Sequence, residues 1–186
     1  MKGTKIVLIA LISILTVGCD LFIAPKNQQL TAPILIDGYV TPLPLWEAIS
    51  PAMQVKTAAA IPSAYALIKF DLSGIPADAH VDAAFLTLQA TAVAQPGTIE
   101  ASRILQNWVP PVNFTTAQDP NFVSIEAVQR SITAPGSYSL NVTSFVGAWR
   151  DGANNYGIRL GAPNDCEVLF ATSESATPPE LVIAYH

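Results

Sequence analysis

The chain has 186 residues, enough for one ordinary domain with a full hydrophobic core. Hydrophobic residues make up 51% of it and charged residues only 12%, which is about half the usual charged fraction. Nine basic against 14 acidic side chains give a net charge of −5, and no run of basic residues is present, so we expect no binding to nucleic acid.

Residues 1–18 have the pattern of a signal peptide. Lys2 and Lys5 precede an apolar run from Ile6 to Val17. A helix of that length rises about 18 Å, whereas the hydrocarbon core of a bilayer is about 30 Å thick. The run is therefore typical of a secretory signal rather than of a membrane span.

The residues that end this segment, "LTVGC", resemble a bacterial lipobox. The resemblance implies that the sulfur of Cys19 receives a diacylglycerol group and that the mature chain begins there, anchored by lipid on the extracytoplasmic side of a membrane. The alternatives are an uncleaved anchor and a plain secretory peptide. Residues 19–33 are then the lipidated N-terminus and a polar tether, and the domain occupies residues 34–186.

Short apolar runs bounded by Pro and Gly fill that domain. In "VDAAFLTLQATAV", Ala84, Leu86 and Leu88 alternate with Phe85 and Thr87, which predicts a strand with one buried face. Similar runs are "YALIKFDL", "GTIEASRIL", "FVSIEAV", "GSYSLNV", "YGIRLGA", "CEVLF" and "PELVIAYH". This pattern predicts an all-β fold, an antiparallel β-sandwich.

One segment has helical rather than strand spacing. An apolar stripe runs through Val142, Phe145, Val146 and Trp149. Asn141 or Thr143 can cap the start of this helix, and Gly152 lies just past its end. We expect one short helix at a corner of the sandwich, with the stripe closing one end of the core.

Cys166 is the only cysteine left once Cys19 is lipidated. In "CEVLF" it shares a strand face with Val168 and Phe170, which predicts a buried thiol. The alternative is a disulfide with another chain.

Five segments, in this order, resemble the DNRLRE family, which is related to the disaggregatase repeat and to certain carbohydrate-binding modules. They are "DGYV" (37–40), "ALIKFDLSGIPADAHVDAAFLTL" (66–88), "NWVPPVNF" (107–114), "YSLNVTSFVGAW" with "NNYGIRL" (138–160), and "FATSESATPPELVIAY" (170–185). The resemblance implies a jelly-roll-like sandwich in an extracellular protein, with sugar binding in some members. The loop "TPLPLWEAISPAM" departs from the family pattern.

Catalytic and metal-binding patterns are absent from the sequence. The two histidines, His80 and His186, are not part of a recognisable nucleophile–base motif. No cluster of His and Cys residues has the spacing of zinc ligands. We therefore expect a protein that is not an enzyme and that needs no cofactor. A calcium ion is an alternative, since five side chains supply oxygens in one loop region: Asp151, Asn154, Asn155, Asp165 and Glu167.

Sugar recognition favours an exposed aromatic ring beside amides and carboxylates. Trp46 lies in a Pro-rich loop with Glu47 beside it, and Asn155 and Tyr156 lie between the predicted helix and the next strand. The hypothesis is that these four residues contribute to weak binding of polysaccharide. The alternative is a structural or adhesive domain of the cell envelope that contacts other proteins and binds no small ligand.

Overall fold

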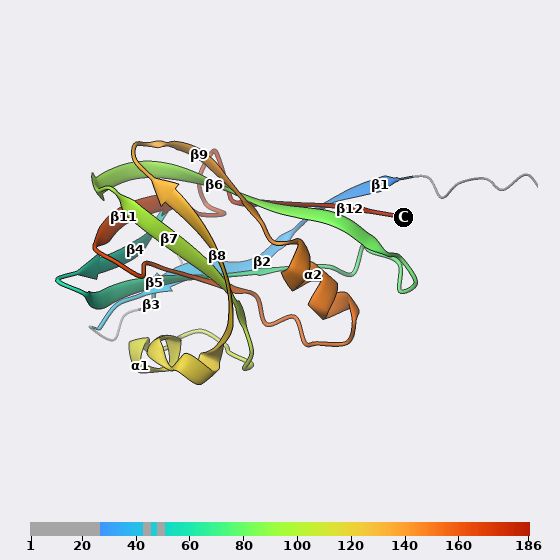
Figure 1. Cartoon of the computed structure of the whole chain (residues 1–186), viewed down its shortest axis with the longest axis horizontal. Coiled ribbons are helices and arrows are strands. Elements are labelled where there is room, and N and C mark those ends of the chain that lie inside the picture. The colour runs from blue at the N-terminus through green and yellow to red at the C-terminus, as the bar shows by residue number, and fades with distance from the viewer. Residues whose placement is uncertain (1–26, 43–45, 48–50) are drawn as a thin grey trace, which may run out of the picture.

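The computed structural model describes residues 27–42, 46–47 and 51–186, so the predicted signal peptide and Cys19 lie outside the described residues. Among the described residues, no helix has both the length and the apolar character needed to cross a membrane. The strands, labelled in Figure 1, are β1 (Gln28–Ala32), β2 (Ile34–Val40), β3 (Trp46–Glu47), β4 (Ala52–Ala58), β5 (Ile61–Phe70), β6 (Val81–Gln95), β7 (Gly97–Ile104), β8 (Val123–Ile132), β9 (Gly136–Asn141), β10 (Ile158–Gly161), β11 (Cys166–Ala171) and β12 (Glu180–Tyr185). The helices are α1 (Phe114–Gln118), the 3-10 turn η1 (Pro120–Phe122) and α2 (Thr143–Arg150).

Antiparallel pairing joins the strands into two packed layers. The β6 layer contains β1, β12, β6, β9, β11 and β4, and the β5 layer contains β3, β2, β5, β10, β7 and β8. Strand β5 belongs to both, because its first residues pair with β4 and the rest pair with β2 and β10. The predicted all-β antiparallel sandwich is confirmed.

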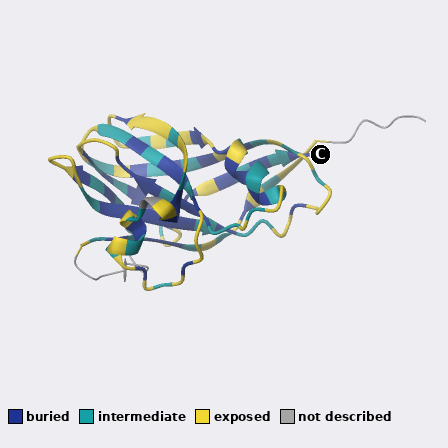
Figure 2. Ribbon diagram, turned by 60° about the horizontal axis from the view of Figure 1, so that its bottom comes forward, coloured by how far each residue is buried: buried dark blue, intermediate teal, exposed yellow. Residues whose placement is uncertain are grey.

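The main core lies between the two layers (Figure 2). Leu86 and Leu88 of β6 point into it, and so do Ile68 and Phe70 of β5, as the alternation predicted. Each such side chain is completely buried, which stabilises the fold by about 1.5–3 kcal/mol per residue.

The predicted corner helix is confirmed as α2, whose apolar stripe is buried in the main core. The side-chain oxygen of Asn141 accepts hydrogen bonds from the backbone N–H and the hydroxyl of Thr143. The same hydroxyl oxygen accepts from the backbone N–H of Ala84 on β6, which fixes the helix against the sheet. After the helix, Gly152 takes a φ of +106°, a conformation that suits glycine.

A second hydrophobic cluster lies on the outer side of the β5 layer and was not predicted. It contains Val40, Tyr65, Leu67, Ile104, Trp108, Val112, Ala117, Phe122 and Val123. Helix α1 contributes Ala117 to it and is capped by Asn113, whose side-chain oxygen accepts a hydrogen bond from the N–H of Thr116. The fold therefore has a second short helix besides the predicted one. Helix α1 shields Leu67 and the neighbouring apolar side chains on the outer face of the β5 layer from solvent.

Strand β1 lies within the stretch expected as a tether. It pairs with β12 from Gln28 to Ala32. Ala32 is buried and Leu30 packs partly against the main core, so the sheet begins at residue 28 rather than near residue 34.

The thiol of Cys166 is buried in the main core beside Val168 and Phe170, as predicted. Burial raises its pKa above the usual value, because a thiolate would lose its hydration there. Glu167, on the opposite face of β11, forms an ion pair with Lys56 at 2.8 Å.

Candidate functional site

Three rows of side chains cross the outer face of β12, β6 and β9. Alternation along β6 turns Phe85, Thr87 and Gln89 away from the core, and residues paired in register share a face of the sheet. The rows are Val182–Phe85–Asn141, Glu180–Thr87–Ser139 and Gln89–Ser137. We call this set the β6 face. Because a strand rises about 3.4 Å per residue, the rows follow one another at about 7 Å.

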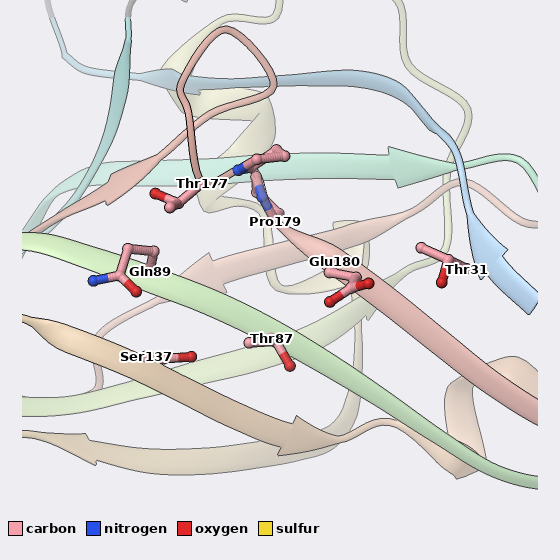
Figure 3. A pocket seen from close by; sticks show the side chains of 8 residues that line it. Thr31, Thr87, Gln89, Ser137, Thr177, Pro179 and Glu180 are labelled. Atoms are coloured by element: carbon pink, nitrogen blue, oxygen red, sulfur yellow. The ribbon is translucent and has the colours of Figure 1, made fainter.

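A shallow groove of about 460 Å³ lies over the polar rows of the β6 face, a volume within the range of ligand pockets. Its lining consists of Thr31, Thr87, Gln89, Ser137, Thr177, Pro178, Pro179 and Glu180. Figure 3 shows Thr177 and Pro179 bordering the groove on one side and Ser137 on the other. Loop 172–179, between β11 and β12, therefore forms one wall.

That loop is fixed by a carboxylate from the other layer. Asp37 on β2 is buried, and its two oxygens accept hydrogen bonds from the backbone N–H and the hydroxyl of Ser173, each at 2.7 Å. Further along, the N–H and hydroxyl of Ser175 both donate to the carbonyl of Thr172. The Ser175 hydroxyl oxygen in turn accepts from the N–H of Thr177, a lining residue. One wall of the groove is thus positioned before any ligand arrives.

The groove combines groups that suit a ligand with many hydroxyls. Hydroxyl and amide side chains donate and accept hydrogen bonds, and the carboxylate of Glu180 accepts them. Phe85, one row away, has an exposed fraction of 44%, and an exposed ring can pack against the apolar C–H groups of a sugar. The β6 face is therefore a candidate carbohydrate site.

The sequence contained part of this signal. The alternation in "AFLTLQAT" puts Phe85, Thr87, Gln89 and Thr91 on one face of a strand. Ser137 and Glu180 come from distant segments that only the pairing of β9 and β12 with β6 brings alongside.

The predicted ligand residues Trp46 and Glu47 form the two-residue strand β3, which pairs with Val40 and Tyr39 of β2. Their side chains lie outside the described residues, so only this backbone position is known. Position 46 is opposite Val40, a member of the second cluster.

Asn155 and Tyr156 make structural contacts. The amide of Asn155 donates to the carbonyl of Phe70 at 2.9 Å and accepts from the N–H of Gly157 at 3.1 Å. Tyr156 packs against the second cluster, and its backbone carbonyl accepts from the indole N–H of Trp108 at 2.6 Å. Tyr156 thus lies on the outer side of the β5 layer and β3 pairs within that layer, so neither belongs to the β6 face, and the joint ligand role of the four residues stays a prediction.

Among the described residues, no group of three or more His, Cys, Asp or Glu side chains is arranged to hold a metal ion. Three of the oxygen donors named for calcium have other partners: Asn155, as described above, Asp165 and Glu167. Asp165 accepts from the N–H of Ala60, and Glu167 pairs with Lys56 and accepts from Gln54.

The model of carbohydrate-binding module family 96 matches residues 48–185, well over half of the chain. The matched stretch contains the whole β6 face and loop 172–179. No curated protein matches the sequence. The match confirms the carbohydrate-binding-module part of the expected resemblance, whereas membership of the DNRLRE family stays a prediction.

Proposed function

The chain belongs to carbohydrate-binding module family 96, and we propose that it binds polysaccharide through the β6 face without catalysing a reaction on it. The observation that carries the proposal is the arrangement of the three rows. An exposed aromatic ring, Phe85, lies beside a groove lined by hydroxyls, an amide and one carboxylate. Because loop 172–179 is already fixed by Asp37, binding a sugar would cost little ordering of the protein.

We further propose that lipid on Cys19 holds this module on the extracytoplasmic side of a membrane. The support is the lipobox-like "TVGC" behind a short apolar run. Eight residues separate Cys19 from the first residue of β1, Gln28, and they span at most about 30 Å. The groove would then face polymers close to the membrane surface.

Affinity electrophoresis tests the binding site. In native gels that contain a soluble polysaccharide, Phe85→Ala should lose about tenfold in affinity, equivalent to about 1.4 kcal/mol. Ile125→Ala is the matched control, because Ile125 is a fully exposed apolar residue on β8 of the other layer. Equal retention of the parent and of Phe85→Ala would contradict a site on the β6 face.

The site predicted from Trp46, Glu47, Asn155 and Tyr156 is tested in the same gels. If a folded Trp46→Ala variant loses retention while Phe85→Ala keeps it, the result would show that the sugar site lies on the β5 layer. If instead Trp46→Ala unfolds or binds as well as the parent, Trp46 is no platform for sugar.

The alternative function, an envelope domain that contacts other proteins, is favoured by apolar side chains exposed near the outer strand of the β5 layer. Ile125 is fully exposed, and Val109 has an exposed fraction of 72%. Under this alternative, no polysaccharide retards the parent protein. Capture of envelope proteins should then fall when Ile125 is changed to Lys.

A further inference from the structure

We infer that two copies of this chain associate through strand β8, with the two strands antiparallel and Val128 of each copy facing Val128 of the other. The inference goes beyond the proposed function, because it names a second copy of the chain as the partner of a strand that does not line the groove. It follows from the exposed edge of the β5 layer and from the charges along that edge.

Strand β8 is the last strand of the β5 layer and has a free edge. It pairs with β7, and no other described strand pairs with it (Figure 1). Three other described strands have a single partner, but β8 has ten residues, whereas β1 has five, β3 two and β9 six. A free edge presents a row of unpaired backbone N–H and C=O groups, to which another strand can add.

The regular part of this edge runs from residue 127 to residue 132. These residues pair in register with β7, whereas residues 124–126 lie in a bulge opposite the single residue Arg103. Proteins protect exposed edges with prolines, lysines or bulges. Strand β8 contains neither proline nor lysine, and its bulge ends before Ala127. The stretch that follows the bulge is therefore open to pairing.

Two opposite charges flank Val128 at equal distances along β8. Glu126 lies two residues before it and Arg130 two residues after it, and both are exposed. Among the described residues, neither forms an ion pair within its own chain. Arg130 does act on Tyr138 of β9, whose pKa is lowered first by a hydrogen bond with Ala134 and to a smaller extent by the charge of Arg130. Both charges thus lack a partner of opposite sign.

A symmetric antiparallel pair can form only in certain registers. Outward-pointing backbone groups alternate along a strand, so the twofold axis has to pass beside one residue, which then faces its own copy. With Val128 at the axis, Glu126 of each copy faces Arg130 of the other, which gives two ion pairs. With Gln129 at the axis, Arg130 faces Val128, and with Arg130 at the axis the two like charges face each other. Opposite charges directly across two strands stabilise the pair and like charges destabilise it, so the charges select the register centred on Val128.

The association is expected to be weak, because only residues 126–130 pair and exposed ion pairs contribute little individually. The proposed lipid on Cys19 would raise the local concentration of two copies in one membrane without a new contact. A covalent trap is therefore a suitable probe.

Disulfide trapping of the full chain tests the register. Val128→Cys should give a covalent dimer on non-reducing gels after mild oxidation with copper phenanthroline, because the two Cα atoms would lie about 5 Å apart, within disulfide range. Ser131→Cys is the matched control. It changes another residue of the same strand that is exposed, but in this register the two copies of position 131 lie about 20 Å apart. The parent chain, with Cys19 and Cys166 unchanged, gives the background.

A second pair of variants avoids any change at Val128, which is partly buried. Ala127 and Gln129 are exposed, and in this register each faces the other residue of the second copy. A mixture of Ala127→Cys and Gln129→Cys, one of them carrying a larger tag, should therefore form a covalent dimer of mixed size.

Charge reversal tests the two ion pairs. In the Val128→Cys chain, Glu126→Arg and Arg130→Glu should each lower the dimer yield at least about fivefold, because each sets like charges opposite one another. Both reversals together restore opposite charges and should restore the yield. Urea unfolding checks that every variant is folded.

Absence of a dimer above the background, with Val128→Cys and with the mixture, would overturn the inference. Equal trapping at positions 128 and 131 would also overturn it, because that result indicates random collision. A folded double reversal that fails to restore the yield, or single reversals that leave it unchanged, would show that these charges do not set the register and would overturn the inference as well.

Discussion

Asp37 and Ser173 are 136 positions apart in the sequence, yet both oxygens of the Asp37 carboxylate accept hydrogen bonds from Ser173. Asp37 belongs to the β5 layer, and Ser173 belongs to the loop that borders the groove on the β6 layer. This pair therefore links the interior of the sandwich to one wall of the candidate site.

Asp37→Asn should destabilise the fold and weaken sugar binding together. The substituted amide cannot accept at both of its ends, so one bond to Ser173 is lost inside a buried site. Hydrogen bonds to charged groups contribute about 1.5–3 kcal/mol, and we expect a loss of about 2 kcal/mol in the free energy of unfolding, measured by urea denaturation. Glu174→Gln removes an exposed acid of the same loop and should change stability by less than about 0.5 kcal/mol. Equal stability of the two variants would show that the bonds to Ser173 contribute little.

Trp149 should be among the largest single contributors to stability. Its side chain is 7% exposed and packs in the main core at the end of α2. Large aromatic truncations in cores cost about 3–5 kcal/mol, and Trp149→Ala should fall in this range when unfolding in urea is followed by circular dichroism. A loss below about 1 kcal/mol would mean that Trp149 does not close the core.

A second variant, Trp149→Phe, tests what the buried indole N–H of Trp149 costs. The indole N–H of Trp149 is buried without a hydrogen-bond partner in the described structure. Phe removes this donor while keeping most of the ring, so we expect a loss of only about 1–2 kcal/mol.

Alternation and helical spacing made much of the sandwich predictable. On β6, small and branched apolar residues occupy every second position from Ala84 to Ala90, and all of them are buried. The stripe that ends at Trp149 predicted α2 in the same way. In both segments a single face is buried, so the sequence carries one clear period.

Segments without one clear period were missed. Strand β1 is short and mostly polar and becomes ordered through its pairing with β12. On β5, Leu67 lies on the face opposite Ile68 and Phe70, and α1 and its neighbours cover that face, so both faces of this part of the strand are buried. The candidate site was missed for a related reason: its rows depend on which strands pair, and single-strand patterns do not contain this information.

Gly157→Ala should be strongly destabilising. Gly157 has a φ of +95°, and a Cβ there would overlap the backbone carbonyl of Ile68 on β5. Both the strained dihedral and the clash oppose a side chain, so we expect a loss of about 2–4 kcal/mol, measured by thermal and urea unfolding.

Gly147→Ala is the matched control for this change. Gly147 lies within α2, and a Cβ there meets nothing within 4 Å. Because alanine is the better helix former, this variant should gain up to about 1 kcal/mol. If both variants lose stability to a similar extent, the positive φ and the close contact at Gly157 are not the cause of its sensitivity to substitution.

Lipidation is the last prediction. If "TVGC" is a lipobox, bacterial cells that express the full chain and are fed an alkyne-labelled fatty acid should label it, and the protein should partition into the detergent phase. Cys19→Ser removes the sulfur that receives the lipid, so it should abolish labelling and leave the larger, uncleaved precursor. Cys166→Ala is the control: it removes the other cysteine, which is buried in the core, and should leave labelling intact. Labelling and processing that persist in Cys19→Ser would show that the chain is anchored, if at all, by some other route.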